Sequence, residues 1–98
     1  MKLDFGAAIR GAREARQMTQ RQVAQLASLQ QSHLSLLESG RRYPSLSALD
    51  RIAAALRLPS FVLVYLATPE ETLAPFPPQV RRELDRVVEG FLCTKDQT

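Results

Sequence analysis

Residues 19–40 read TQRQVAQLASLQQSHLSLLESG and contain the signals for two short helices joined by a tight turn. Thr19 can cap the free amides of a helix that starts at about Gln20, and the glutamine three residues after Thr19 can complete a capping box. The helical spacing breaks at Ser28-Leu29. A second short helix is predicted from Gln31 to Ser39, and the glycine that follows can end it because glycine readily adopts a positive φ.

A longer helix is predicted on each side of this pair, because apolar or small residues recur there at helical spacing. The first covers about Asp4 to Gln17, and the second begins after Pro44-Ser45 and ends before Pro59. The next run, Phe61 to Ala67, is apolar on every side. This suits either a short buried helix or, given its valines and tyrosine, a strand, and periodicity leaves both readings open.

The C-terminal third has a different composition. Prolines 69, 75, 77 and 78 remove backbone donors and fix φ, which predicts a semi-rigid linker over residues 68–78. A last helix is predicted from about Gln79 to Leu92. The chain therefore divides into a helical domain at residues 1–67, the linker, and an amphipathic helix with a tail at residues 79–98.

Composition excludes several classes of function. The 98 residues suit one domain with a short appendage. Cys93 is the only cysteine and His33 the only histidine, so we expect no disulfide, no metal site, no cofactor and no enzyme. The longest apolar run is far shorter than the roughly 18 residues of a membrane span, and the first residues lack the core of a signal peptide. These features predict a cytoplasmic protein without a membrane partner.

Charge is unevenly distributed along the chain. Residues 1–67 carry nine lysines and arginines against four acidic residues, whereas residues 68–98 carry four against six. The basic part would attract a polyanion such as DNA, although acidic proteins and membrane surfaces would be attracted too.

The helix predicted over residues 31–39 has two different faces. Leu34 and Leu37 lie on one side, and short polar side chains lie on the other: Gln31, Ser32, Ser35 and Ser39. Two short helices joined by a tight turn commonly place the second helix in the DNA major groove. The polar face then reads bases, for example by a glutamine that bonds adenine, unless it is merely solvated.

From Phe5 to Leu58 the chain resembles the lambda-repressor and Cro-like helix-turn-helix regulators, often called the XRE family. The residues that carry the resemblance are Ile9, Arg13, the stretch 18–24 (MTQRQVA), Leu34, Leu37, Glu38, Gly40, Arg41, the stretch 44–46 (PSL), Ile52, Ala53, Ala55 and Leu56. The resemblance implies an all-α, five-helix DNA-binding domain, here followed by the proline-rich linker and an additional C-terminal helix.

The resemblance also implies roles for individual residues. Bases would be read by Gln31, Ser32 and Ser35, with Leu36 at the edge of that face touching a thymine methyl. Phosphates would be held by Gln20, Arg41 and Arg42, while His33 lies at a flank where it either donates to a phosphate or is simply exposed. A salt bridge between Arg13 and Glu38 would join the first helix to the third.

Two positions depart from the family pattern. Ser28 stands in the turn where the family usually has glycine, and a serine at positive φ is strained by roughly 1 kcal/mol or more. Gln30 stands where a small capping residue commonly opens the third helix. In addition, the helix predicted over residues 31–39, which would enter the groove as the recognition helix, contains no arginine. We therefore expect no arginine from this helix to read guanine.

The remaining apolar surface predicts a homodimer. The expected interface combines Phe61, Leu63 and Leu66 with a stripe on the last helix: Val80, Leu84, Val87 and Phe91. The alternative is that this stripe packs on its own chain. A dimer would place two recognition helices on an inverted-repeat operator, which predicts a transcriptional regulator that represses, or sometimes activates, a promoter. The alternative function is an antitoxin-like autoregulator whose C-terminal segment also binds a partner protein.

Overall fold

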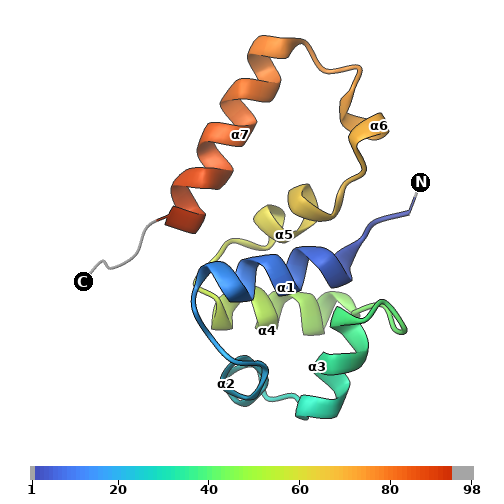
Figure 1. Cartoon of the computed structure of the whole chain (residues 1–98), viewed down its shortest axis with the longest axis vertical. Coiled ribbons are helices and arrows are strands. Elements are labelled where there is room, and N and C mark those ends of the chain that lie inside the picture. Colours follow the sequence, from blue (N-terminus) through green and yellow to red (C-terminus); the bar gives the residue numbers. More distant parts are fainter. Residues whose placement is uncertain (1, 94–98) are drawn as a thin grey trace.

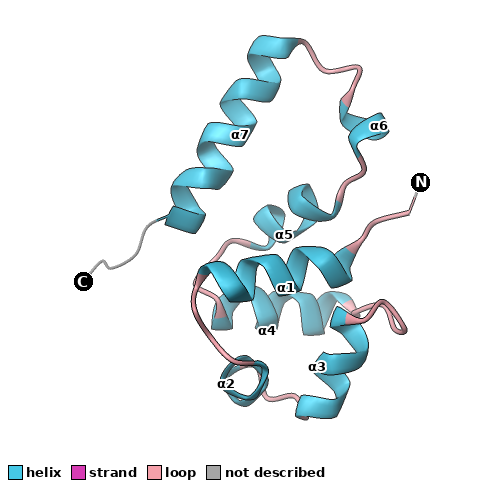
Figure 2. Ribbon diagram, in the orientation of Figure 1, coloured by secondary structure: helices cyan, strands magenta, loops and turns pink. Residues whose placement is uncertain are grey.

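The structure is a computed structural model that describes residues 2–93. Seven helices, joined by loops, form this part of the chain (Figure 1). They are α1 (Phe5–Ala15), α2 (Gln20–Leu26), α3 (Gln31–Glu38), α4 (Leu46–Ala55), α5 (Ser60–Ala67), α6 (Glu70–Leu73) and α7 (Pro78–Cys93). Figure 2 shows only helices and loops across these residues, which confirms the all-α prediction.

Side-chain caps explain where three of the helices begin. Asp4 accepts a hydrogen bond of 3.1 Å from the amide of Ala7 at the start of α1. The predicted capping box at α2 is confirmed, because Thr19 and Gln22 each bond the other's backbone amide. At the start of α4, Ser45 accepts a hydrogen bond of 3.0 Å from the amide of Ala48. α3 follows Gln30 without a side-chain cap, as the sequence indicated.

Four helices end in a left-handed residue. Gly40 has φ +80°, and the non-glycine residues Gln17, Ser28 and Arg57 have φ of 58°, 59° and 60°. After each of them the next amide bonds the carbonyl five residues earlier, as Leu29 does to Ala24 at 2.8 Å. This is the bond of a Schellman motif, which satisfies a carbonyl that the helix itself leaves free. The turn between α2 and α3 therefore forms with serine in the strained position.

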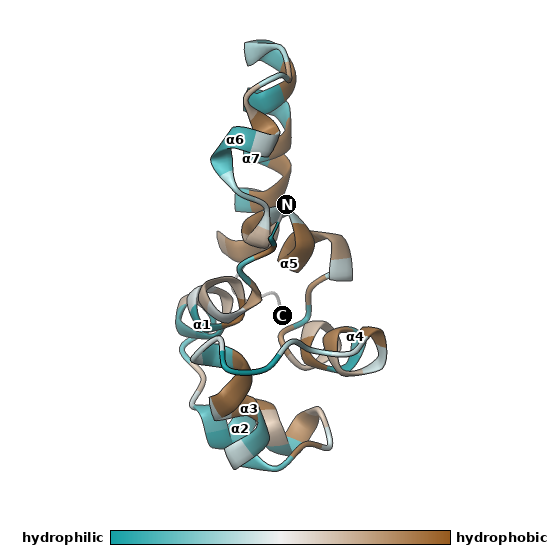
Figure 3. Cartoon of the chain, turned by 90° about the vertical axis from the view of Figure 1, so that its right-hand side faces the viewer, coloured by the Kyte–Doolittle hydropathy of each residue, from teal (hydrophilic) through white to brown (hydrophobic). Residues whose placement is uncertain are grey.

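The apolar run of residues 61–67 lies in α5, so it is a helix and not a strand. This helix packs against α1 and α4. Its inward side chains are Val62, Leu63 and Ala67, and Figure 3 shows α5 coloured hydrophobic almost throughout. Leu63 is fully buried in the core of its own domain. The prediction that Leu63 forms a dimer surface is therefore wrong, because the helical spacing of α5 turns it inward.

The proline-rich segment is more ordered than a simple linker. It contains the short helix α6, and Leu73 at the end of α6 is buried. The chain runs away from α5 through α6 and returns through α7, whose last turn comes back to the end of α1 (Figure 1). Among the side chains of α7, Val88 is the buried one.

Candidate nucleic-acid interface

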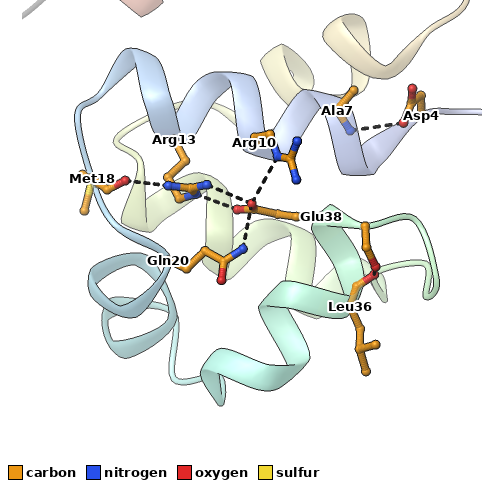
Figure 4. Close-up of polar contacts among 9 residues, drawn as sticks. Asp4, Ala7, Arg10, Arg13, Met18, Gln20, Leu36 and Glu38 are labelled. Carbon is orange, nitrogen blue, oxygen red and sulfur yellow. Dashed lines mark hydrogen bonds and ion pairs between the residues drawn. The ribbon is translucent and has the colours of Figure 1, made fainter.

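The two faces of α3 are separated as the sequence predicts. Leu34 and Leu37 are fully buried and hold the helix to the core. The opposite face leaves three short polar side chains exposed: Gln31, Ser32 and Ser35. His33 and Leu36 are half-buried on one side of this face, and Figure 4 shows Leu36 pointing away from α1. The proposed base-reading side chains thus share one accessible face.

A close helix contact fixes the C-terminal end of α3 against α1. A Cβ atom at Gly6 would lie 2.6 Å from the backbone oxygen of Glu38 and 3.0 Å from that of Leu37. Only glycine lets the two backbones approach this closely. Sequence reasoning missed Gly6, because a glycine inside a predicted helix does not reveal which backbone it touches.

Glu38 is the centre of a polar network between α1, α2 and α3 (Figure 4). Its side chain is 1% exposed, and Arg13 donates to both carboxylate oxygens, at 2.7 and 3.0 Å. Gln20 donates to the same carboxylate at 3.0 Å. Arg10, which sequence reasoning missed, approaches it at 3.9 Å while remaining mostly exposed.

This network supplies the charge that a buried carboxylate needs. Removing a carboxylate from water is costly unless it is paired and hydrogen-bonded, and here a two-pronged arginine contact does both. The hydrogen bond to Glu38 raises the pKa of Arg13, so this guanidinium stays charged. Arg13 also bonds the carbonyl of Met18 at 2.9 Å, which holds the chain just before α2.

The two arginines after α3 lie on the exposed surface beside the recognition helix. The backbone amides of Arg41 and Arg42 both bond the carbonyl of Leu36, at 3.0 and 3.3 Å, so their backbone is held against the last turn of α3. Arg42 also lines a surface hollow together with Lys2 and Tyr43. Lys2 is a cation of this region that sequence reasoning missed, because it lies far from Arg42 along the chain.

The fold leaves some of the predicted dimer residues exposed and packs others against the same chain. Phe61, Leu66, Val80 and Val87 are exposed, and Leu84 is half-buried. Phe91 packs its ring edge-on against Phe61, with centroids 5.9 Å apart, so part of the stripe on α7 covers its own chain. The alternative prediction, that the stripe packs on its own chain, thus holds for the C-terminal end of α7, while the rest of the stripe remains uncovered.

A capped helix, a tight turn and a second helix with one anchored and one polar face define a helix-turn-helix module. Residues 4–60, more than half of the chain, match the family model described as a helix-turn-helix domain. The chain therefore belongs to the helix-turn-helix family of transcriptional regulators, which confirms the lambda-repressor and Cro-like resemblance.

Two curated relatives are regulators. The chain is 38% identical over 92 residues to the HTH-type transcriptional regulator y4dL of Sinorhizobium fredii, covering 91% of this chain and 41% of the relative. It is 30% identical over 96 residues to the immunity repressor protein of Bacillus phage phi105, covering 86% of this chain and 67% of that repressor. The chain thus spans less than half the length of the first of these relatives.

Two solved structures have the same fold. The restriction-modification controller protein C.AhdI of Aeromonas hydrophila superimposes with a TM-score of 0.60 at 31% identity, over 62% of this chain and 92% of its own. A hypothetical transcription factor from Neisseria, NHTF, gives a TM-score of 0.61 at 24% identity, over 84% and 82% of the two chains, and supports the fold alone. Within residues 2–93, no helix combines the length and the apolar character needed to cross a membrane.

Proposed function

We propose that this chain is a transcriptional repressor that binds an inverted-repeat operator as a homodimer, with α3 of each copy in the major groove. The observation that carries the proposal is the exposed face of α3, where Gln31, Ser32 and Ser35 lie opposite the buried Leu34 and Leu37. Short polar side chains allow a helix to approach base edges closely, and the amide of a glutamine can bond adenine through two atoms. Leu36 at the edge of this face would contact a thymine methyl.

Phosphate contacts on both sides of α3 would position it in the groove. Arg41 and Arg42 follow its last turn, and His33 lies at its flank. Gln20 begins α2 and uses one amide hydrogen to bond Glu38. Because a glutamine amide carries two hydrogens, the second is available to a phosphate while the bond to Glu38 holds the side chain in place.

The homodimer is proposed from apolar surface that one copy leaves uncovered. Phe61 is 51% exposed, Val80 41% and Val87 46%, and Leu66 and half-buried Leu84 complete the surface. Val80, Leu84 and Val87 follow one another along α7 at helical spacing, and an exposed apolar stripe of this kind commonly marks an interface. A second copy would also supply the second recognition helix, since a single module of this size usually binds DNA weakly.

The name of one relative, an immunity repressor, supports repression in particular, and the name of the restriction-modification controller protein supports regulation. Occupancy of a promoter by the dimer requires no chemistry from the chain. We therefore propose a regulator without catalytic activity, in which DNA binding itself is the function.

Selection from a random duplex library tests the DNA-reading face. We expect the full chain to enrich an inverted repeat. Gln31→Ala should lose about 1–3 kcal/mol of affinity for it, the cost of a lost two-atom base contact, and Ser32→Ala should also bind it less tightly. Gln79→Ala, an exposed glutamine of α7, is the matched control and should bind as the parent does. Folded Gln31→Ala and Ser32→Ala variants that both retain parental affinity and selectivity would refute the assignment.

The phosphate contacts have a different signature. Arg41→Ala and Arg42→Ala should weaken binding to operator and unrelated duplexes alike, since phosphates carry no sequence information. The slope of log affinity against log salt should fall by about one unit for each lost contact. An unchanged slope in both variants would show that neither arginine holds the backbone.

A further inference from the structure

The side chain of Arg16 joins the ends of two helices that are far apart in the sequence. Its Nε donates to the carbonyl of Leu56 at 2.7 Å, at the end of α4. Its Nη2 donates to the carbonyl of Phe91 at 2.8 Å, in the last turn of α7. Longer bonds of 3.3 Å reach the carbonyls of Arg57 and Leu92 at the same two ends.

These are favourable positions for a guanidinium. The last carbonyls of a helix have no partner within it, and they form the negative end of the helix dipole. A guanidinium presents five donors in one rigid plane, so a single side chain can serve two acceptor groups that face different directions. Arg16 itself follows the last turn of α1, so its side chain connects α1, α4 and α7 at one point.

The C-terminal end of α7 is fastened around this point. Val88 is buried and the ring of Phe91 packs on Phe61, while in the middle of the helix Asp85 accepts a hydrogen bond of 2.5 Å from Tyr65 of α5. Toward the start of the helix, Val80 is exposed, and Arg81 pairs with Glu70 of the short helix α6 at 2.9 Å. The Glu70 side chain is 75% exposed, so this ion pair holds the start of α7 only weakly. With its 16 residues α7 is about 24 Å long, so a small change of angle at the fastened end displaces the opposite end by several ångströms.

We infer that Arg16 is a positioning residue for DNA recognition: it sets the angle between α7 and the DNA-reading domain, and so the half-site spacing that the dimer accepts. The inference rests on the proposed dimer, in which the exposed part of α7 meets the second copy. The angle of α7 then determines where the two α3 helices lie relative to each other. Two half-sites must be separated by about one helical turn or a multiple of it, and a misplaced partner cannot reach both.

The test measures affinity for a series of duplexes in which the two half-sites of the library-selected operator are moved apart or together by single base pairs. The variant is Arg16→Lys, because an ammonium keeps the charge but lacks the planar fork. Arg82→Lys, at an exposed position of α7, is the matched control. Sedimentation and circular dichroism check that both variants remain folded dimers, and a duplex with one half-site reports whether α3 still reads bases.

We expect the parent and Arg82→Lys to lose about tenfold or more when the spacing changes by one base pair, because avidity disappears when both sites cannot be engaged. Arg16→Lys should bind the single half-site as the parent does, but lose most of its discrimination between spacings. A parental spacing profile for folded, dimeric Arg16→Lys would overturn the inference.

A second variant keeps the inference testable if Arg16→Lys fails to fold. Phe91→Leu removes the ring contact at the same joint and leaves Arg16 in place, and it should also broaden the spacing profile. A sharp, parental profile for Phe91→Leu would then contradict the inference. Failure of the proposed function looks different, because a parent chain that is monomeric or indifferent to spacing would refute the dimer itself.

Discussion

The five helices α1 to α5 and the two helices that follow them differ in how far their apolar side chains are buried. The largest fully buried side chains all belong to the first group: Ile9, Val23, Leu34, Leu37, Ile52, Leu56, Val62 and Leu63. In the second group only two hydrophobic side chains are buried within the described residues, Leu73 and Val88. The DNA-reading domain therefore closes its own core, whereas the C-terminal helices do not.

The difference fits the proposed function, in which the first region reads DNA and the second pairs two copies of the chain. A closed core holds α3 in one position, because packed interiors do not deform continuously. Phe76, Val80 and Val87 in the second region remain exposed, and they provide surface that a second copy can cover. Substitutions in the first region should therefore change the stability of one chain, and those on the exposed surface of the second should change its assembly.

The largest effect on stability is expected from Glu38→Ala. It removes the buried acceptor of Arg13 and Gln20, and breaking a buried ion pair costs about 3–5 kcal/mol. Glu14→Ala, an exposed glutamate on α1, is the control and should change stability by less than about 0.5 kcal/mol. Urea unfolding followed by circular dichroism measures both, and equal midpoints for the two variants would show that the network contributes nothing.

A smaller effect separates two glycines of α1. Gly6→Ala forces a Cβ against the backbone of α3 and should destabilise the chain by about 1–3 kcal/mol. At Gly11 a Cβ meets nothing within 4 Å, so Gly11→Ala should stabilise α1 by up to about 1 kcal/mol through helix propensity. Thermal melts of the pair decide the matter, since shifts of the same sign would disprove the close contact between α1 and α3.

The smallest effect concerns the turn before α3. Ser28 has φ 59°, so Ser28→Gly should relieve strain and stabilise the chain by about 1 kcal/mol. The same change at Ser47, exposed within α4, should destabilise it by about 0.5–1 kcal/mol, because glycine is a poor helix former. Chemical unfolding compares the two, and a loss of stability in Ser28→Gly would contradict the strained turn.

Much of the DNA-reading domain could be predicted because its signals are local. The capping box at Thr19, the glycine at position 40 and the faces of α3 follow from spacing alone. The state of residues 61–67 could not, because a run that is apolar on every side has no period, and only packing against α1 and α4 makes it a helix. Leu63 was misplaced for the same reason.

The contacts of Gly6 and Arg16 could not be predicted from the sequence for another reason. Their partners are backbone atoms of residues distant in sequence, and every residue carries the same backbone groups. No side-chain pattern marks such a partner. Arg13 and Glu38 could be paired in advance only through the family resemblance, and the structure does bring them together.

Sedimentation equilibrium of the full chain tests most directly whether the exposed surface of α7 pairs two copies of the chain. The account predicts a particle of twice the 11.0 kDa chain mass for the parent and for Gln79→Asp, a control on the same helix. Val87→Asp should yield a folded monomer, since it places a charge on the uncovered surface of α7 and leaves the core untouched. A parent chain that stays monomeric at high micromolar concentration, or a Val87→Asp variant that stays dimeric, would contradict the account.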